Sequence, residues 1–117
     1  MKSAGLESLK LELPVDNFTD SNWHMFQVVL PLDQLNVDRA QIMTDLKDLG
    51  IGTGVHYPTI TGFTLYQNLG YKTESTPIAQ RIGRSILTLP LFPGMTDEDI
   101  NRIASALAGI LKKHLKN

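Results

Sequence analysis

The helix predicted over residues 96–113 limits most strongly what this chain can fold into. Thr96 can cap that helix, and three acidic residues follow it, where the helix dipole favours negative charge. Apolar residues then recur every three or four positions and form one stripe, which consists of Ile100, Ile103, Ala104, Leu107, Ile110 and Leu111. Such a helix is stable only when another apolar surface covers the stripe, so the chain must supply a second layer.

The chain is long enough to supply that layer within one domain. It has 117 residues, of which 42% are apolar and 20% are charged, a composition typical of soluble globular proteins. This composition excludes a fully disordered chain. The sequence has no internal repeat and no low-complexity tract, so it predicts a single packed body.

The charge balance and the lack of cysteine exclude several classes of function. The net charge of −1 is too small for the positive field that nucleic acids or anionic membranes attract, so we expect neither partner. No stretch approaches the roughly 20 apolar residues of a membrane span, and the start of the chain has no signal-peptide pattern. Without cysteine, disulfides, thiolate metal sites and a cysteine nucleophile are excluded. We therefore expect a cytoplasmic protein.

Three strands and two further helices are expected before the last helix. Apolar and β-branched runs that stop at prolines predict the strands, at residues 23–30, 51–57 and 85–92. One helix is expected to begin after a cap at Asn36 and to end at Gly50. A shorter helix is expected from Thr76 and Pro77 to about Arg84. Residues 59–75 are expected to be a loop with one helical turn near residues 65–69.

This order of elements predicts the fold class and the domain division. We expect an α/β fold of the two-layer α+β type, with helices packed on a small, mainly antiparallel sheet of about three strands. Residues 1–20 are the least regular part, because Pro14 ends a short helical face. We expect them to form a lead-in segment to a domain that spans residues 21–117.

Three histidines could contribute to a site. His24 falls inside a predicted strand, which favours a core or interface histidine. His114 falls at a lysine-rich helix end, which favours a solvated surface residue. His56 is the candidate for function, because it stands with Tyr57 where a strand enters a long loop. From the spacing alone, a structural role for His56 remains equally open.

The sequence contains no evident catalytic centre of its own. It has no P-loop and no G-x-S-x-G elbow, and the Gly52 and Gly54 pair lacks the third glycine and the helix of a dinucleotide site. The acidic residues do not cluster in a metal-ligand pattern. No lysine lies in an apolar context that would favour covalent binding of a cofactor. We therefore expect no catalytic, cofactor-binding or metal-binding residues within this chain.

Three sequence blocks resemble one enzyme family in the same order. They are NWHMFQVVL at 22–30, DLKDLGIGTGVHYP at 45–58 and SILTLPLFPGMTDEDINRI at 85–103. They resemble the C-terminal region of the DegT/StrS-type, PLP-dependent sugar aminotransferases of fold type I. The sequence of the second block is most similar to that of the enzymes that form 4-amino-4-deoxy-arabinose sugar nucleotides. The resemblance covers about residues 21–112.

The resemblance implies a small C-terminal domain of a larger enzyme. In that family a large N-terminal domain holds the pyridoxal 5'-phosphate (PLP) and the lysine that binds it, and the small domain closes over the cofactor cleft. His56 and Tyr57 match a strand-end histidine and aromatic residue near the substrate pocket, where they would position a sugar nucleotide. The stretch from His56 to Gly62 departs from the family pattern, since it has threonine where the nearer relatives have a second histidine.

The functional hypotheses follow from this resemblance. The full enzyme would transfer an amino group, with glutamate as the donor, to a keto-sugar nucleotide, and its cofactor would be PLP. We expect this chain alone to bind no PLP and to be inactive. The alternative is a stand-alone α/β binding or regulatory module derived from the same fold. Without the N-terminal PLP domain, an apolar patch around Trp23, Phe63 and Phe92 could also cause self-association.

Overall fold

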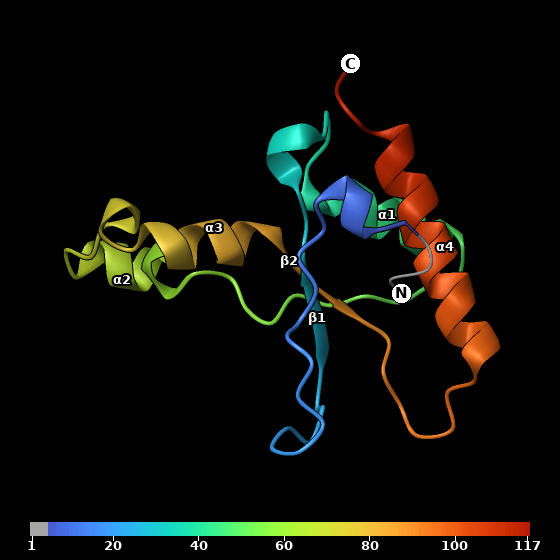
Figure 1. Cartoon of the computed structure of the whole chain (residues 1–117). Helices are drawn as coiled ribbons and strands as arrows, with labels where there is room; N and C mark the ends of the chain where they lie inside the picture. The colour runs from blue at the N-terminus through green and yellow to red at the C-terminus, as the bar shows by residue number, and fades with distance from the viewer. Residues whose placement is uncertain (1–4) are drawn as a thin grey trace.

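A computed structural model describes residues 5–117 and shows a mixed α/β fold (Figure 1). The described part contains two strands, β1 (Phe26–Val29) and β2 (Ile86–Leu89), and four α-helices. The helices are α1 (Arg39–Asp48), α2 (Thr64–Asn68), α3 (Pro77–Ser85) and α4 (Asp97–Lys113). The strands cross the middle of the molecule, α1 and α4 lie on one side of them, and α2 and α3 project on the other.

The sheet is a two-stranded antiparallel ribbon, so the expectation of about three strands is wrong for the described residues. In the register of the pair, Phe26 lies opposite Leu89 and Val29 opposite Ile86. The predicted strand at residues 51–57 contributes only one bridge, in which Gly54 and Thr88 exchange backbone hydrogen bonds of 3.0 and 2.8 Å. Two glycines and the nearby Pro58 explain this shortfall, because glycine loses the most conformational entropy on ordering. The antiparallel pairing and the packed helices confirm the rest of the predicted class.

The core lies between one face of this ribbon and the helices α1 and α4. Val28 and Leu87 from the strands are fully buried, as are Ile42 and Leu46 from α1. The predicted stripe of α4 supplies the other side, with Leu107 and Leu111 fully buried. Ile100 is the exception, since its side chain is 37% exposed.

The N-terminal segment packs into the same core. Leu6, Leu9 and Leu11 are all buried within it, and Glu12 forms a backbone bridge with Val29 of β1. These contacts join residues 5–13 to the body of the fold. The first four residues of the predicted lead-in segment lie outside the described residues, and the division between residues 1–20 and 21–117 remains a prediction.

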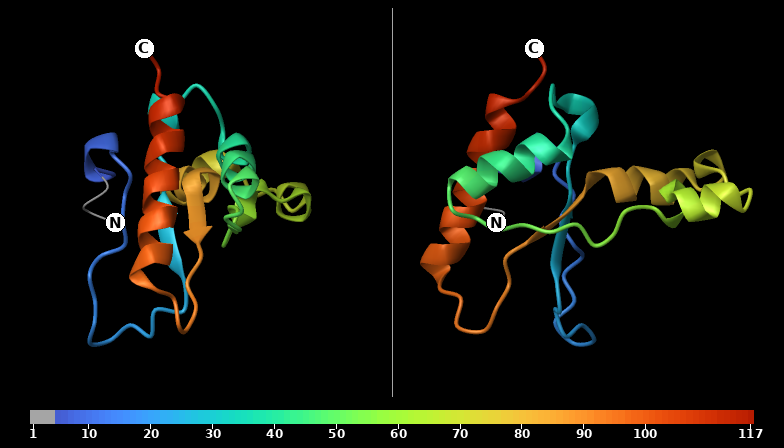
Figure 2. Two further views of the ribbon diagram at one scale, coloured as in Figure 1. Left: turned by 90° about the vertical axis from the view of Figure 1, so that its right-hand side faces the viewer. Right: turned by 180° about the vertical axis from the view of Figure 1, so that it is seen from behind.

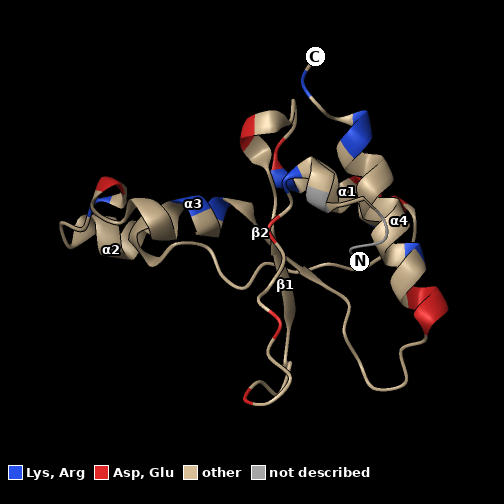
Figure 3. Ribbon diagram, in the orientation of Figure 1, with Lys and Arg blue, Asp and Glu red and all other residues tan. Residues whose placement is uncertain are grey.

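The ends of the long helices follow their capping signals. Thr96 and Asp99 form a reciprocal capping box at the start of α4, in which the Asp99 backbone N–H donates to Thr96 Oγ1 at 3.2 Å. Figure 3 shows acidic residues at this end of α4 and lysines at the other, as the helix dipole favours. For α1 the expected cap at Asn36 is wrong. Asp38 caps it instead, and its carboxylate accepts from the Gln41 N–H at 3.0 Å.

Residues 58–85 form an arm that stands away from the core (Figure 2). The arm includes α2, which confirms the predicted helical turn, and α3, which confirms the predicted short helix. Its apolar side chains are exposed: Ile60, Leu65, Leu69 and Ile78 are 59–71% exposed. The radius of gyration is accordingly 15.4 Å, whereas a compact chain of this length would have about 13 Å.

Arg39 and Gly83 attach the arm to the body. The Arg39 guanidinium donates from Nη1 to the carbonyl oxygens of Gly83 at 2.7 Å and Ile86 at 3.1 Å. Burial lowers the pKa of Arg39, while the charge of Asp38 acts in the opposite direction. Gly83 lies directly against the backbone of Thr59, so that a Cβ atom placed there would come within 2.6 Å of the Thr59 nitrogen.

A polar cluster joins α1 to the end of α4. His114 Nε2 lies 2.7 Å from Asp45 Oδ2, and both side chains are nearly buried, with exposed fractions of 12% and 11%. The prediction of a solvated surface histidine is therefore wrong for His114, because α1 packs over the end of α4. Hydrogen bonds from His114 and then Gln41 lower the pKa of Asp45 from 3.8 to about 2.

This cluster predicts a pH-dependent contribution to stability. The pKa of Asp45 is lower in the folded chain than in the unfolded chain, so its carboxylate stabilises the fold above about pH 4. That contribution is lost as the pH falls through about 2. Asp45→Asn should lower the free energy of unfolding at neutral pH, and its difference from the wild type should shrink toward pH 2. Urea unfolding followed by circular dichroism at a series of pH values measures this. Asp48→Asn removes an exposed carboxylate from the same helix and serves as the control; a pH-independent loss in Asp45→Asn would contradict the assignment.

Candidate functional site

The candidate site lies on the face of the β-ribbon that points away from the core. Side chains alternate along a strand, so Gln27 and Thr88 share the face opposite to that of Phe26 and Leu89. His56 Nδ1 lies 2.9 Å from Thr88 Oγ1, and Gln27 Nε2 donates to the backbone carbonyl oxygen of His56. These two contacts hold both the ring and the backbone of His56 against the ribbon.

Gly54 makes room for the His56 ring. A Cβ atom at residue 54 would lie 2.8 Å from His56 Cε1, closer than carbon atoms can pack. Gly54 is also the residue that bridges to Thr88. The glycine therefore lets the ring lie over the backbone at the same point where the chain joins the edge of the ribbon.

Tyr57 extends the site into solvent. Its side chain is 71% exposed, and its ring meets the His56 ring edge to face, with 5.0 Å between the ring centroids and an interplanar angle of 83°. The peptide bond between the two residues is cis. Within residues 5–117, His56 Nε2 has no hydrogen-bond partner. The pair thus offers one imidazole nitrogen and one phenol hydroxyl to a polar ligand.

The described residues do not offer a lysine suited to covalent PLP binding or a cluster of metal ligands. Covalent PLP binding needs a lysine in a cavity, but every lysine from Lys10 to Lys116 is exposed. In residues 5–117 no three histidine or acidic side chains lie together as metal ligands would. The site can hold and orient a ligand through His56 and Tyr57.

Two residues of this site were missed by the sequence analysis, and the core alternative for His24 is wrong. Gln27 and Thr88 are single polar residues within apolar runs, and their shared register is the signal that could have identified them. His24 was expected in the core or an interface. It is exposed, because β1 begins only at Phe26, so it does not lie in the core, and its place in an interface remains a prediction.

Several solved aminotransferases contain a portion with this fold. Spr1654 from Streptococcus pneumoniae, described as a sugar aminotransferase, superposes in its PLP form with a TM-score of 0.79 at 24% identity. The match covers 98% of this chain and 31% of that one. DesV from S. venezuelae, solved with a ketimine intermediate, matches at a TM-score of 0.71 and 25% identity, over 95% of this chain and 31% of DesV. A PLP-dependent aminotransferase from Bacillus cereus matches at a TM-score of 0.72 and 25% identity, over 91% and 27% of the two chains.

The fold is therefore that of one portion of these aminotransferases. A sequence model of the DegT/DnrJ/EryC1/StrS aminotransferase family matches residues 2–108, and the chain belongs to that family. It spans less than a third of the length of the solved relatives. No helix in residues 5–117 is long and apolar enough to cross a membrane.

Proposed function

We propose that this chain is the C-terminal small domain of a PLP-dependent aminotransferase that acts on a keto-sugar nucleotide, with glutamate as the amino donor. The observation that carries the proposal is the extent of the match. The family model covers residues 2–108, yet the chain corresponds to only 31% of Spr1654. Every lysine from Lys10 to Lys116 is exposed. This supports the proposal that another part of the enzyme binds the cofactor.

In this proposal His56 and Tyr57 position the sugar nucleotide. Thr88 and Gln27 fix the imidazole and its backbone, so little conformational entropy is lost when His56 Nε2 binds a ligand. The exposed Tyr57 ring can stack on a base or sugar, and its hydroxyl can donate or accept a hydrogen bond. The residues bind and orient, and PLP held elsewhere in the enzyme supplies the amino-transfer chemistry.

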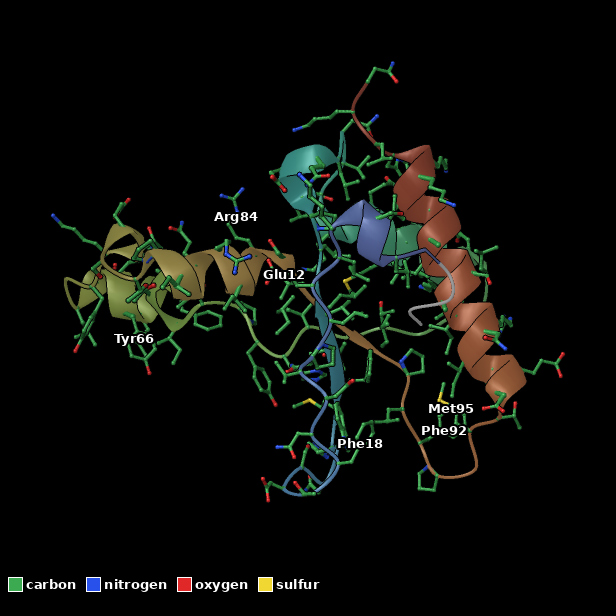
Figure 4. All side chains as sticks on the ribbon, viewed as in Figure 1. Glu12, Phe18, Tyr66, Arg84, Phe92 and Met95 are labelled. Atoms are coloured by element: carbon green, nitrogen blue, oxygen red, sulfur yellow. The ribbon has the colours of Figure 1, made fainter. Side chains whose placement is uncertain are left out.

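The arm supports the proposed partner domain. Phe63 in the arm is 48% exposed and Phe92, before α4, is 53% exposed, on opposite sides of the ribbon (Figures 1 and 4). They therefore do not form one patch with Trp23, as the sequence analysis expected. The arm exposes several apolar side chains, among them Ile60, Phe63 and Leu65, and we propose that the PLP domain covers them. Alone, the chain is expected to self-associate through this surface, which sedimentation at increasing concentration measures.

The proposal is tested by supplying the missing part. The isolated chain, incubated with PLP and reduced with borohydride, should carry no stoichiometric adduct by mass spectrometry. A chimera in which this chain replaces the matching portion of Spr1654 should transfer the amino group of glutamate to a keto-sugar nucleotide. A stoichiometric adduct on the isolated chain would contradict the proposal. Nucleotide-sugar binding by the isolated chain, together with an inactive chimera, would support the stand-alone binding module instead.

The positioning role has its own signature in that chimera. Tyr57→Ala and His56→Ala should each raise KM for the sugar nucleotide by about tenfold, as expected for the loss of about 1.4 kcal/mol of binding, with a smaller effect on kcat. Gly54→Ala should reproduce the His56 effect because it displaces the ring, whereas Gly52→Ala, which has open space around it, should not. A loss confined to kcat would instead indicate a role in the chemical step.

A further inference from the structure

One long run of the chain contains no acidic residue, lysine or arginine. It spans residues 49–71, although such residues make up 20% of the chain. Several apolar side chains of this run are exposed, among them Tyr57, Phe63 and Leu65. Exposed apolar surface of this extent is typical of an interface with another protein. The lack of charge indicates that the partner surface is also uncharged.

The uncharged run includes one edge of the β-ribbon. Gly54 exchanges two backbone hydrogen bonds with Thr88, so its N–H and C=O point toward β2. Backbone groups alternate in direction along a paired segment, so those of Thr53 and Val55 point away from β2. Within residues 5–117, none of these four groups has a hydrogen-bond partner. Residues 53–55, which we call the open edge, therefore present two donors and two acceptors to another extended backbone.

The opposite edge of the ribbon is protected against pairing. There Glu12 bridges to β1, and its carboxylate accepts a hydrogen bond from Arg81 Nη1 at 2.6 Å; Figure 4 labels Glu12 at this edge. Pro14 follows two residues later and has no N–H to donate. Charged side chains and prolines are the devices by which natural sheets prevent pairing between edges. The open edge contains neither of them.

Two glycines leave space for another backbone at the open edge. A Cβ atom at Gly52 would have no neighbour within 4 Å. A Cβ atom at Gly54 would point at the His56 ring, so that ring lies over a face of the ribbon and does not cover its edge. In an antiparallel pair the Cα atoms come closest, to about 4.5 Å, where the two residues are not hydrogen-bonded to each other. Glycine permits this approach because it has no side chain.

We propose that the open edge pairs with the open edge of a second copy of this chain, antiparallel and about a two-fold axis. Thr53 of one copy lies opposite Val55 of the other, so the free backbone groups form four hydrogen bonds between the copies. Gly54 then meets its equivalent at the position of closest approach. A two-fold contact requires a surface that is complementary to itself. An uncharged edge with equal numbers of donors and acceptors meets that requirement. This proposal does not depend on the proposed aminotransferase function.

Residue-resolved NMR tests this pairing. The amides of Thr53 and Val55 should exchange with solvent about tenfold more slowly at millimolar than at micromolar protein concentration, whereas the Gly52 amide should not change. In a mixture of labelled and unlabelled chains, an isotope-filtered spectrum should show a nuclear Overhauser effect between the Hα protons of Gly54 in the two copies. Leu65→Glu disrupts the apolar surface of the arm and should leave both signals in place. Loss of these signals in Leu65→Glu, or their absence in the wild type, would overturn the proposal.

Variants in the Leu65→Glu background separate the backbone contact from side-chain contacts. Val55→Pro removes one outward N–H from each copy and should weaken dimerisation, measured by sedimentation equilibrium, by about tenfold or more, since two hydrogen bonds are lost. Val55→Ala shortens the same side chain, keeps the N–H and should dimerise as its background does. Circular dichroism checks that Val55→Pro is folded, and the Gly54 signal between copies keeps the test decisive if it is not. Equal dimerisation of the two variants would refute the assigned pairing.

Discussion

Leu87→Ala should lower the free energy of unfolding by about 2–5 kcal/mol. Leu87 is fully buried at the centre of the two-stranded ribbon, where residues from the N-terminal segment, α1 and α4 belong to the same core. Truncation leaves a cavity, since the ribbon has only two full strands and cannot collapse without losing its pairing. Domains of this size are stable by about 5–15 kcal/mol, so this loss is a large share of the total.

Urea unfolding followed by circular dichroism measures this effect. Leu65→Ala makes the same chemical change at a side chain that is 65% exposed in the arm, and it should alter stability by less than about 0.5 kcal/mol. Equal losses in the two variants would show that the arm, and not the ribbon face, supplies the core.

Gly83→Ala should disrupt the packing at the base of the arm. A Cβ atom at residue 83 would meet Thr59 Oγ1 at 2.3 Å and the Thr59 backbone nitrogen at 2.6 Å. The clash is with backbone, so the segment before α2 must move, and the hydrogen bond from Thr59 Oγ1 to the Ala79 carbonyl oxygen is lost with it. We expect a destabilisation of about 1–3 kcal/mol.

The destabilisation caused by Gly83→Ala should be confined to the arm. Hydrogen exchange should accelerate across residues 58–82 and much less in β1, β2 and α4, because no apolar side chain of the arm is part of the buried core. Gly62→Ala is the matched control, since a Cβ atom there has no neighbour within 4 Å. It should be neutral or stabilising by up to about 1 kcal/mol. Acceleration spread evenly over the whole chain would contradict the separation of arm and body.

The helices were predictable because their signals are local. The capping box at Thr96 and Asp99 and the apolar stripe that follows lie within one continuous segment. The start of α3 at Pro77 is marked by the proline itself. The exact cap of α1 was not predictable in this way, because Asn36 and Asp38 are both good capping residues and stand two positions apart.

The candidate site was predictable in part. His56 and Tyr57 were identifiable from their place before Pro58 and from the family resemblance. Their partners were not, because Thr88 is 32 residues and Gln27 is 29 residues away from His56 along the chain. The pairing of β1 with β2 brings Gln27 and Thr88 onto one face of the ribbon. No local sequence pattern predicts the register of that pairing.

The sequence by itself determined the helical segments, the absence of thiol chemistry and, through three ordered motifs, the aminotransferase family. Each of these depends on neighbours along the chain or on composition. Tertiary structure alone decided that residues 51–57 contribute one bridge, that Leu6 to Leu11 join the core, and that Asp45 pairs with His114. Those outcomes depend on which distant surfaces meet, since a strand or a buried charge is stable only with its partner in place.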